Sequence, residues 1–339
     1  MEKQDFLKEP VEHIDIKSFD SSPIIAAMRD MSFTARDTAR ASEILGEMID
    51  DEDCTIILCI AGSASAAGCM HIYVDMVRNN MVDVVVATGA SIVDMDFFEA
   101  IGFRHYKGSS YADDRRLRDL YIDRIYDTFI DEEQLQICDD TVKEIADSLD
   151  RRPYSSREFI AYMGKYLATN AKKQDSLVLA AYENDVPVFC PAFSDSSAGF
   201  GLVKHQVEYP ENHVSIDSVK DFRELTEIKM RSPVSGLFII GGGVPKNFAQ
   251  DTVVCAEVLG KSVDMHKYAV QITVADVRDG ACSSSTLKEA SSWGKVDTGR
   301  EQMVYAEATS VLPLIVSCAY HKRNRADRPP RKWNKIFEL

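Results

Sequence analysis

The chain has 339 residues, of which 45% are hydrophobic and 27% are charged, proportions that are ordinary for a soluble globular protein. Its formal net charge of −15 argues against nucleic acid as a general partner and favours cationic ligands. No apolar run has membrane-spanning length, and residues 1–5 lack the apolar core of a signal peptide, so we expect a cytoplasmic protein without a membrane partner.

The eight cysteines are scattered along the chain and form no Cys-x-x-Cys pair. Several, such as Cys54, Cys59 and Cys190, lie inside apolar runs of strand length. We therefore expect buried free thiols in a reducing compartment, with neither disulfides nor a metal site.

The first third of the chain alternates helices with strands that end in turns of small residues. In chain order we expect a polar arm over residues 1–20 and a helix from about Thr34 to Ile49. A strand from Thr55 to Ile60 then leads through the small-residue turn 61–68 into a helix that ends at about Asn80. A second strand, from Val82 to Ala87, leads through the turn Thr88–Ser91 into a helix that carries Asp94 and Asp96. This order predicts a βαβ unit of a doubly wound parallel sheet, whose ligands bind at the carboxyl ends of the strands. Small residues there either bring backbone N–H groups close to phosphates or only allow tight packing, and neither turn spells Gly-x-Gly-x-x-Gly.

Residues 104–175 are more charged and predict a peripheral layer of helices. We expect amphipathic helices from Leu117 to Phe129, from Asp139 to Leu149 and from Ser155 to Leu167. Ser155 and Glu158 have the spacing of a capping box at the start of the third helix. The acidic run 131–133 is interpreted as a solvated helix start.

The sheet is expected to resume after residue 175. The further predicted strands are 177–182, 186–190, 236–240, 269–274 and the short 303–306. Asp195 lies shortly after one of them and either accepts hydrogen bonds from ribose hydroxyls or caps the next helix. The three glycines 241–243 come directly after another. They favour a ligand that approaches the backbone, although the ending of a Walker loop is missing.

The stretch from Glu289 to Lys295 is the candidate site of the chemistry. A lysine that a large aromatic ring desolvates has a lowered pKa, and a neutral amine can attack an imine or carbonyl carbon and hold it as a Schiff base. The structural alternative is a helix end with Trp293 in the core and Lys295 in solvent.

The stretch from Lys322 to Lys335 is basic and contains Pro329-Pro330. It could bind an acidic neighbouring subunit or form a loose solvated tail. We find no repeat and no linker, so we expect one domain over residues 21–320 between an N-terminal arm, 1–20, and a C-terminal arm, 321–339.

Four of these stretches carry a specific resemblance: Asn80–Gly89, Pro191–Asp195, Ile240–Lys246 and Ser292–Lys295. Together they resemble the deoxyhypusine synthase family over nearly the whole chain. The resemblance implies a Rossmann-type NAD domain and a homotetramer of two tight dimers with active sites at the dimer interface. Family members oxidise spermidine with NAD, release 1,3-diaminopropane and hold the aminobutyl group on a lysine as an imine. The acceptor is one lysine of a translation factor or, in other members, free putrescine.

The resemblance also assigns residues. It makes Lys295 the Schiff-base lysine, while Glu289 and Trp293 line the polyamine slot, which suits an ammonium group and a cationic chain. The implied NAD positions are Gly62, Ser63, Ala66, Thr88, Gly89, Ala90, Asp94, Asp195, Gly242, Val274, Ala275, Asp279, Glu307 and Ala308.

The polyamine end of the implied site departs from the family pattern. Phe200 and Cys282 stand where spermidine-using members carry aspartates, Asn247 where they carry a histidine, and Asp251 where they carry an asparagine. Losing a carboxylate opposite a buried ammonium costs on the order of 3 kcal/mol of binding. We expect an NAD-dependent aminobutyl transferase. The alternatives are a paralogue that uses free amines such as putrescine or agmatine, and a non-catalytic regulatory subunit that binds NAD or polyamine.

Overall fold

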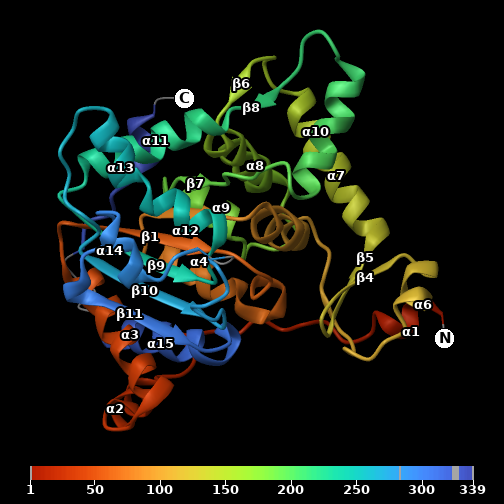
Figure 1. Cartoon of the computed structure of the whole chain (residues 1–339). Helices are drawn as coiled ribbons and strands as arrows, with labels where there is room; N and C mark the ends of the chain where they lie inside the picture. The colour runs from red at the N-terminus through yellow and green to blue at the C-terminus, as the bar shows by residue number, and fades with distance from the viewer. Residues whose placement is uncertain (1, 282–283, 323–327, 338–339) are drawn as a thin grey trace.

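The centre of the computed structural model, which describes residues 2–281, 284–322 and 328–337, is a six-stranded parallel sheet (Figure 1). Its strands are β1 (Cys54–Ile60), β2 (Val84–Ala87), β7 (Val188–Phe189), β9 (Val234–Ile240), β10 (Tyr268–Thr273) and β11 (Glu301–Tyr305). They lie in the order β7-β2-β1-β9-β10-β11. Numbered along the chain this is 3-2-1-4-5-6, the order of doubly wound dinucleotide-binding sheets. The prediction of a doubly wound, parallel α/β fold is confirmed.

Helices cover both faces of the sheet because successive side chains of each strand point to opposite sides. On β1, Ile56 and Leu58 join a core cluster with residues of α3 (Phe33–Asp50), α4 (Met70–Arg78) and α15 (Ala308–Lys322). Ile57 and Cys59 join a second cluster with α11 (Ser218–Arg231), α12 (Gly243–Gln250) and α14 (Leu287–Ser292). The continuous apolar run is thus explained by burial on both faces.

The other helices surround this core. They are α1 (Lys3–Phe6), α2 (Ser22–Arg29), α5 (Phe98–Ala100), α6 (Asp114–Asp119), α7 (Glu132–Asp147), α8 (Ser156–Asn170), α9 (Leu177–Glu183), α10 (Ser197–Glu208), α13 (Thr252–Val258), the π-helical η1 (Ser65–Cys69) and η2 (Ala90–Phe97), and the 3-10 turns η3 (Thr298–Arg300) and η4 (Trp333–Ile336). None of the helices in the described ranges is long and apolar enough to cross a bilayer.

The helix expected from Leu117 to Phe129 is wrong. In its place lie α6 and a hairpin that belongs to a small antiparallel sheet, with β3 (Tyr106–Lys107), β5 (Thr128–Asp131) and β4 (Ile122–Ile125) in that order. Tyr121 and Tyr126 have φ of 55° and 53°, and a left-handed residue cannot continue a right-handed helix. Figure 1 shows this hairpin at the side of the molecule near the N-terminus. A second small sheet pairs β6 (Pro153–Tyr154) with β8 (Ser215–Ile216).

The strand expected over residues 177–182 is also wrong, because this run forms the buried helix α9. The Asp96 carboxylate accepts the N–H groups of Leu177 and Val178 at 2.7 and 2.8 Å, and the Ser176 hydroxyl caps the N–H of Leu179. Periodicity cannot separate a fully buried short helix from a buried strand.

The remaining two helices of the charged segment are confirmed. Helix α8 begins with the expected capping box between Ser155 and Glu158. Helix α7 begins earlier than expected, with Asp131 as its N-cap. Asp131 itself is not solvated, because it is 8% exposed and accepts a hydrogen bond from Lys3 at 2.6 Å.

The seven cysteines in the described ranges are free thiols, and six of them are buried, as expected. Burial raises the pKa of the Cys54 thiol to about 12, so this sulfur is inert near neutral pH. Cys282, a candidate substrate residue, lies outside the described residues.

Both terminal segments lie against the chain's own domain. Val11 in the N-terminal arm donates its N–H to the His105 carbonyl at 2.9 Å. In the basic C-terminal arm, the part over residues 328–337 packs on the sheet of its own chain. Arg328 forms an ion pair with the buried Asp83, and Trp333, 8% exposed, joins the second core cluster.

Candidate active site

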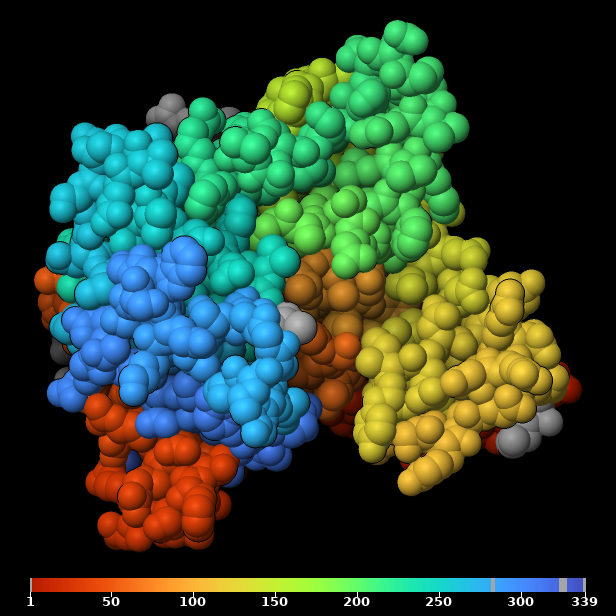
Figure 2. Space-filling model, in the orientation of Figure 1, coloured from red at the N-terminus to blue at the C-terminus, as the bar shows by residue number. Residues whose placement is uncertain are grey.

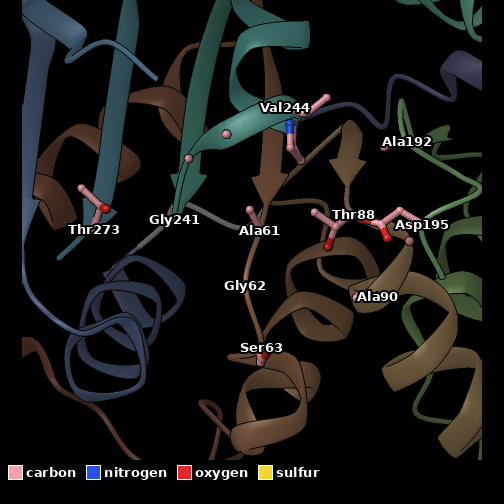
Figure 3. Close-up of a pocket in the computed structure, with 14 residues that line it drawn as sticks. Ala61, Gly62, Ser63, Thr88, Ala90, Ala192, Asp195, Gly241, Val244 and Thr273 are labelled. Atoms are coloured by element: carbon pink, nitrogen blue, oxygen red, sulfur yellow. The ribbon is translucent and has the colours of Figure 1, made fainter. Parts of the chain in front are cut away.

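A cavity of about 450 Å³ opens at the carboxyl ends of β1, β2, β9 and β10. It lies where the strand order reverses, between β1 and β9, which is the usual ligand position in such sheets. Its lining residues are Ala61, Gly62, Ser63, Thr88, Gly89, Ala90, Ala192, Asp195, Gly241, Gly242, Gly243, Val244, Pro245 and Thr273. Figure 3 shows Thr88 and Asp195 on one side of this cavity and Thr273 on the opposite side. In Figure 2 a hollow separates the blue and teal surface of the second half of the chain from the yellow surface around residues 105–135.

The three glycines give the cavity one wall of bare backbone. Gly241 has φ of 79°, and a Cβ there would lie 3.0 Å from the Ala61 carbonyl oxygen. Gly243, with φ of 64°, begins α12, and a Cβ there would project into open space. The N-cap residue Gly242 offers no side chain to the first-turn N–H groups of α12, so these donors are available to an anion at the rim.

Two aspartates lie beside the cavity. The sequence left two roles open for Asp195, capping the next helix or accepting hydrogen bonds from a ligand, and the structure gives the capping role to Asp94. Asp94 Oδ1 accepts the N–H of Ser197 at 2.7 Å and thereby caps the first turn of α10. Asp195 is exposed and lines the cavity, and its carboxylate is not needed as a cap. Burial is the main cause that raises the pKa of Asp94 to about 6, while its hydrogen bonds with Ser197 oppose that rise.

The turn after β2 approaches the loop before α10 closely. A Cβ at Gly89 would lie 2.6 Å from Ser196 Oγ and 3.3 Å from the Asp195 carbonyl oxygen. A side chain at this position would therefore displace the segment that carries Asp195. The structure thus brings together Gly62, Ser63, Thr88, Gly89, Ala90, Asp195 and Gly242 from the predicted cofactor set.

Other predicted cofactor residues lie elsewhere. Ala66 is 1% exposed and belongs to the core cluster that includes residues of α3, α4 and α15. Glu307 accepts the N–H groups of Thr309 and Ser310 at 3.0 and 3.2 Å at the start of α15, whose first helical residue is Ala308. Val274 is 74% exposed just beyond β10. These four residues are outside the cavity lining.

A second hollow lies next to the cavity, and Thr273 lines both. It gathers three predicted residues, Ala275, Asp279 and Glu289. Glu289 forms a capping box at the start of α14: its carboxylate accepts the Thr286 N–H at 2.6 Å, and the Thr286 hydroxyl accepts the Glu289 N–H at 3.1 Å. These bonds lower the pKa of Glu289, so it is a carboxylate near neutral pH.

Lys295 lines neither the cavity nor the second hollow and lies beyond the end of α14. Its side chain is 12% exposed, and its Nζ lies 2.5 Å from Asp251 Oδ1 and 5.2 Å from the centroid of the Trp293 ring. The Trp293 side chain is the exposed one, at 68%. The structural alternative, with the tryptophan in the core and the lysine in solvent, is therefore wrong in both respects.

The backbone holds Lys295 in place from two sides. Its N–H donates to the Ala290 carbonyl at 3.1 Å, and its carbonyl accepts the N–H of His266 at 3.0 Å. His266 is fully buried, and its Nε2 lies 3.2 Å from the Ala249 carbonyl in the last turn of α12, two residues before Asp251. Burial lowers the pKa of His266 well below its usual value, so its imidazole is neutral.

Helix α12 connects the cavity to this lysine. It begins at Gly243 on the cavity rim and ends directly before Asp251. Eight helical residues span about 12 Å. Asn247 is exposed on α12, and Phe200 is 64% exposed on α10. Lys295 is not among the residues that line the cavity, and its ion-pair partner Asp251 directly follows the helix that begins on the cavity rim.

Lys246 was not among the candidate residues predicted from the sequence. This lysine is fully buried on α12 and donates to the Ser285 carbonyl. Burial lowers its pKa to about 8; the acidic groups of Cys59 and Glu289 oppose this effect and the charge of Lys295 adds to it. In the sequence, the only indication that Lys246 belongs to the site is its position shortly after the three glycines, and a solvated lysine is equally compatible with that position.

Comparison with known proteins matches this chain to one family. Residues 23–319 match the family model described as "Deoxyhypusine synthase". The chain is 69% identical over 337 residues to a "Deoxyhypusine synthase-like protein" of Coxiella burnetii, covering 99% of this chain and 96% of the relative. It is 63% identical over 340 residues to the protein of the same name from Caulobacter vibrioides, covering 99% and 93%. A "Probable deoxyhypusine synthase 2" of Methanosarcina mazei is 37% identical over 321 residues, covering 94% and 92%.

A solved structure shows the same fold at low sequence identity. A putative deoxyhypusine synthase from Entamoeba histolytica superposes with a TM-score of 0.61 at 19% identity, covering 94% of this chain and 100% of that one. The fold and the family model agree with the stretches that carry the resemblance in the sequence. This chain belongs to the deoxyhypusine synthase family.

Proposed function

We propose that this protein is an NAD-dependent aminoalkyl transferase that holds the transferred group on Lys295 as a Schiff base. Family membership supports transfer of an aminobutyl group. The observation that carries the proposal is the setting of Lys295, a largely buried amine between a carboxylate and an exposed indole. An indole face and a carboxylate together suit a cationic aliphatic amine.

The cavity at the sheet edge has the features that a dinucleotide requires. The bare backbone at Gly241–Gly243 and the uncapped N-terminus of α12 suit the phosphates. The exposed Asp195 carboxylate, with Thr88 nearby, suits ribose hydroxyls. NAD bound here would supply the hydride acceptor that turns a substrate amine into an imine.

The chain's own residues would then act on that imine. Trp293 and Asp251 would bind and orient the cationic chain, and Lys295 would attack the imine carbon and displace the departing amine. Lys246, buried on α12 with a pKa lowered to about 8 mainly by burial, would be a second lysine close to Lys295.

A homo-oligomer would bring the separated parts of the site together. Lys295 does not line the cavity of its own chain, and Val274, Val277 and Trp293 are more than half exposed. We propose that the cavity of one protomer faces the lysine of another, in an assembly of dimers. Such burial would also remove these apolar side chains from water.

The donor and acceptor follow from the polyamine end of the site. A spermidine donor with a protein lysine as acceptor is the leading candidate. A free diamine such as putrescine or agmatine is the second, because exposed Phe200 and Asn247 offer no carboxylate to a distal ammonium.

The test is covalent trapping on the chain. The protein is incubated with NAD and labelled spermidine, putrescine or agmatine, and then reduced with borohydride. We expect label on Lys295, full labelling in Lys288→Arg, where an exposed lysine of α14 is changed, and no label in Lys295→Arg. Retained label in Lys295→Arg would reject the proposal. NAD binding without NADH formation for any of the amines would favour the regulatory alternative.

A further inference from the structure

We infer that Asp251 restrains Lys295 as an ammonium in the resting protein, and that a cationic amine frees the lysine by taking over this carboxylate. The inference rests on the proposed function, since it concerns the nucleophile of that reaction. It assigns Asp251 a role in admitting the substrate and not only in binding it.

The exposure of the two partners sets the order of events. Lys295 Nζ lies 2.5 Å from Asp251 Oδ1, and the side chains are 12% and 40% exposed, respectively. The carboxylate therefore faces outward and the amine faces inward. An incoming ammonium meets Asp251 before it meets Lys295. Throughout residues 2–281, 284–322 and 328–337, Lys295 is the single cation found within ion-pair distance of this carboxylate.

The other charges around Lys295 make the pair sensitive to an added cation. Lys246 approaches from α12, with Glu289 of α14 acting on Lys246, and the neutral His266 holds the backbone of Lys295. Glu289 is committed to its capping box with Thr286. Asp251 thus supplies the direct counter-charge to Lys295, and Lys246 is a positive neighbour. A further ammonium on Asp251 weakens that counter-charge and adds a second positive neighbour.

Each proton and electron pair has a destination in this step. The Lys295 ammonium gives one proton to water, breaking an N–H bond and forming an O–H bond, while Asp251 stays a carboxylate opposite the substrate's ammonium. The freed lone pair attacks the carbon of the substrate imine, for whose formation bound NAD would be the hydride acceptor. The lysine nitrogen then loses a second proton to water and its lone pair forms the new C=N bond, while the bond from that carbon to the departing amine breaks and this amine keeps the electron pair and takes a proton from water.

The experiment measures the reactivity of Lys295 without any turnover. Trace acetylation with acetic anhydride at pH 8, in the absence of NAD, is followed by peptide mass spectrometry against free phenylalanine as internal standard. The proteins are the parent, Asp251→Asn, and Glu257→Gln as a matched loss of an exposed carboxylate on α13. Each is measured alone and with putrescine, spermidine, agmatine, or tetramethylammonium chloride at equal ionic strength.

We expect Lys295 to acetylate about tenfold faster in Asp251→Asn than in the parent or in Glu257→Gln. At least one of the three amines should accelerate acetylation of Lys295 in the parent, tetramethylammonium should not, and no amine should accelerate it in Asp251→Asn. Lys261 in the same digest should acetylate equally in all samples, and equal thermal midpoints would show that the variants are folded.

Two results would overturn the inference. Acetylation in Asp251→Asn that is no faster than in the parent would show that the carboxylate does not restrain the lysine. Amines that leave the parent unchanged or slow it would show that no exchange takes place. Because NAD is omitted, the inference can hold even when no aminobutyl transfer is found. Conversely, trapping on Lys295 without acceleration by amines would keep the proposed function and reject this inference.

Discussion

The Asp94 carboxylate lies 2.7 Å from the backbone nitrogen of Ser197, so a residue from the helix after β2 caps a helix that starts a hundred residues later in the chain. This contact fixes the segment that carries Asp195 against the turn that carries Thr88. Because both residues line the cavity, the geometry of the proposed cofactor site depends on Asp94 even though Asp94 does not line the cavity itself.

Asp94→Asn should change how stability depends on pH. Burial raises the pKa of Asp94 to about 6, above its unfolded value of 3.8, so the folded protein binds this proton more tightly than the unfolded chain does. Ionisation therefore costs stability as the pH rises from about 4 to about 6. The neutral amide avoids that cost, and the variant should gain about 3 kcal/mol relative to the parent over this range. Urea unfolding at pH 4, 5, 6 and 7 measures this difference, with the exposed Asp53→Asn as control. A difference that is constant with pH would contradict the prediction.

Lys246→Met should reveal a dependence of opposite sign. Burial lowers the pKa of Lys246 to about 8, below its unfolded value of 10.5, so the unfolded chain binds this proton more tightly. The parent should therefore gain stability relative to the methionine variant as the pH rises from about 8 to about 10.5, by up to about 3 kcal/mol. Denaturation curves at pH 7, 8, 9 and 10 test this, and Lys261→Met should show no such trend.

Gly89→Ala should weaken NAD binding, and a second change should restore it. The added Cβ would lie 2.6 Å from Ser196 Oγ and 2.7 Å from Ser196 Cβ, which forces the loop of Asp195 away. Overpacking of this kind costs ~1–3 kcal/mol, or about tenfold or more in affinity. The double variant Gly89→Ala, Ser196→Gly removes the clash and should bind NAD nearly as the Ser196→Gly single variant does. Calorimetric titration with NAD measures both, and unchanged affinity in Gly89→Ala would exclude the close approach as a requirement.

Arg328→Met should destabilise the protein strongly. The guanidinium pairs with Asp83, donates to the carbonyls of Asn80 and Cys54 at 2.9 and 3.0 Å, and is 6% exposed. Its loss leaves a buried carboxylate without a counter-charge, at a cost of about 3–5 kcal/mol. Adding Asp83→Asn should recover part of that loss. Lys335→Met, where the side chain is 63% exposed, should change the free energy of unfolding by less than about 0.5 kcal/mol. Equal destabilisation by the two single variants would refute the role of the buried pair.

The parallel sheet could be predicted because its strands combine continuous burial with small residues at their carboxyl ends. The runs at 56–60 and 237–240 are uniformly apolar, and both lead into such small residues. The run at 177–182 is also apolar but is a helix, and Asp96, far away in sequence, accepts N–H groups at the start of this helix. The helix predicted over residues 117–129 is wrong because Tyr121 and Tyr126 adopt left-handed conformations, which a tyrosine in the sequence does not indicate.

The part of the candidate site at the strand ends could be predicted from the sequence. The part that depends on contacts between residues far apart in the sequence could not. The turns after β1, β2 and β9 converge as parallel topology requires. By contrast, no local pattern shows that Asp251 pairs with Lys295, that Trp293 is the exposed partner, or that Lys246 is buried. These features depend on how α12 and α14 pack on the second face of the sheet.

The Arg328–Asp83 pair joins residues that are 245 positions apart, and this separation imposes an order on biosynthesis. Asp83 leaves the ribosome long before Arg328 has been made. In the nascent β1–β2 region the Asp83 carboxylate is therefore hydrated, whereas in the mature protein it is buried. The amino-terminal part of the sheet therefore lacks this counter-charge throughout most of translation, and it gains the stability of the pair, about 3–5 kcal/mol, only when Arg328 has been made.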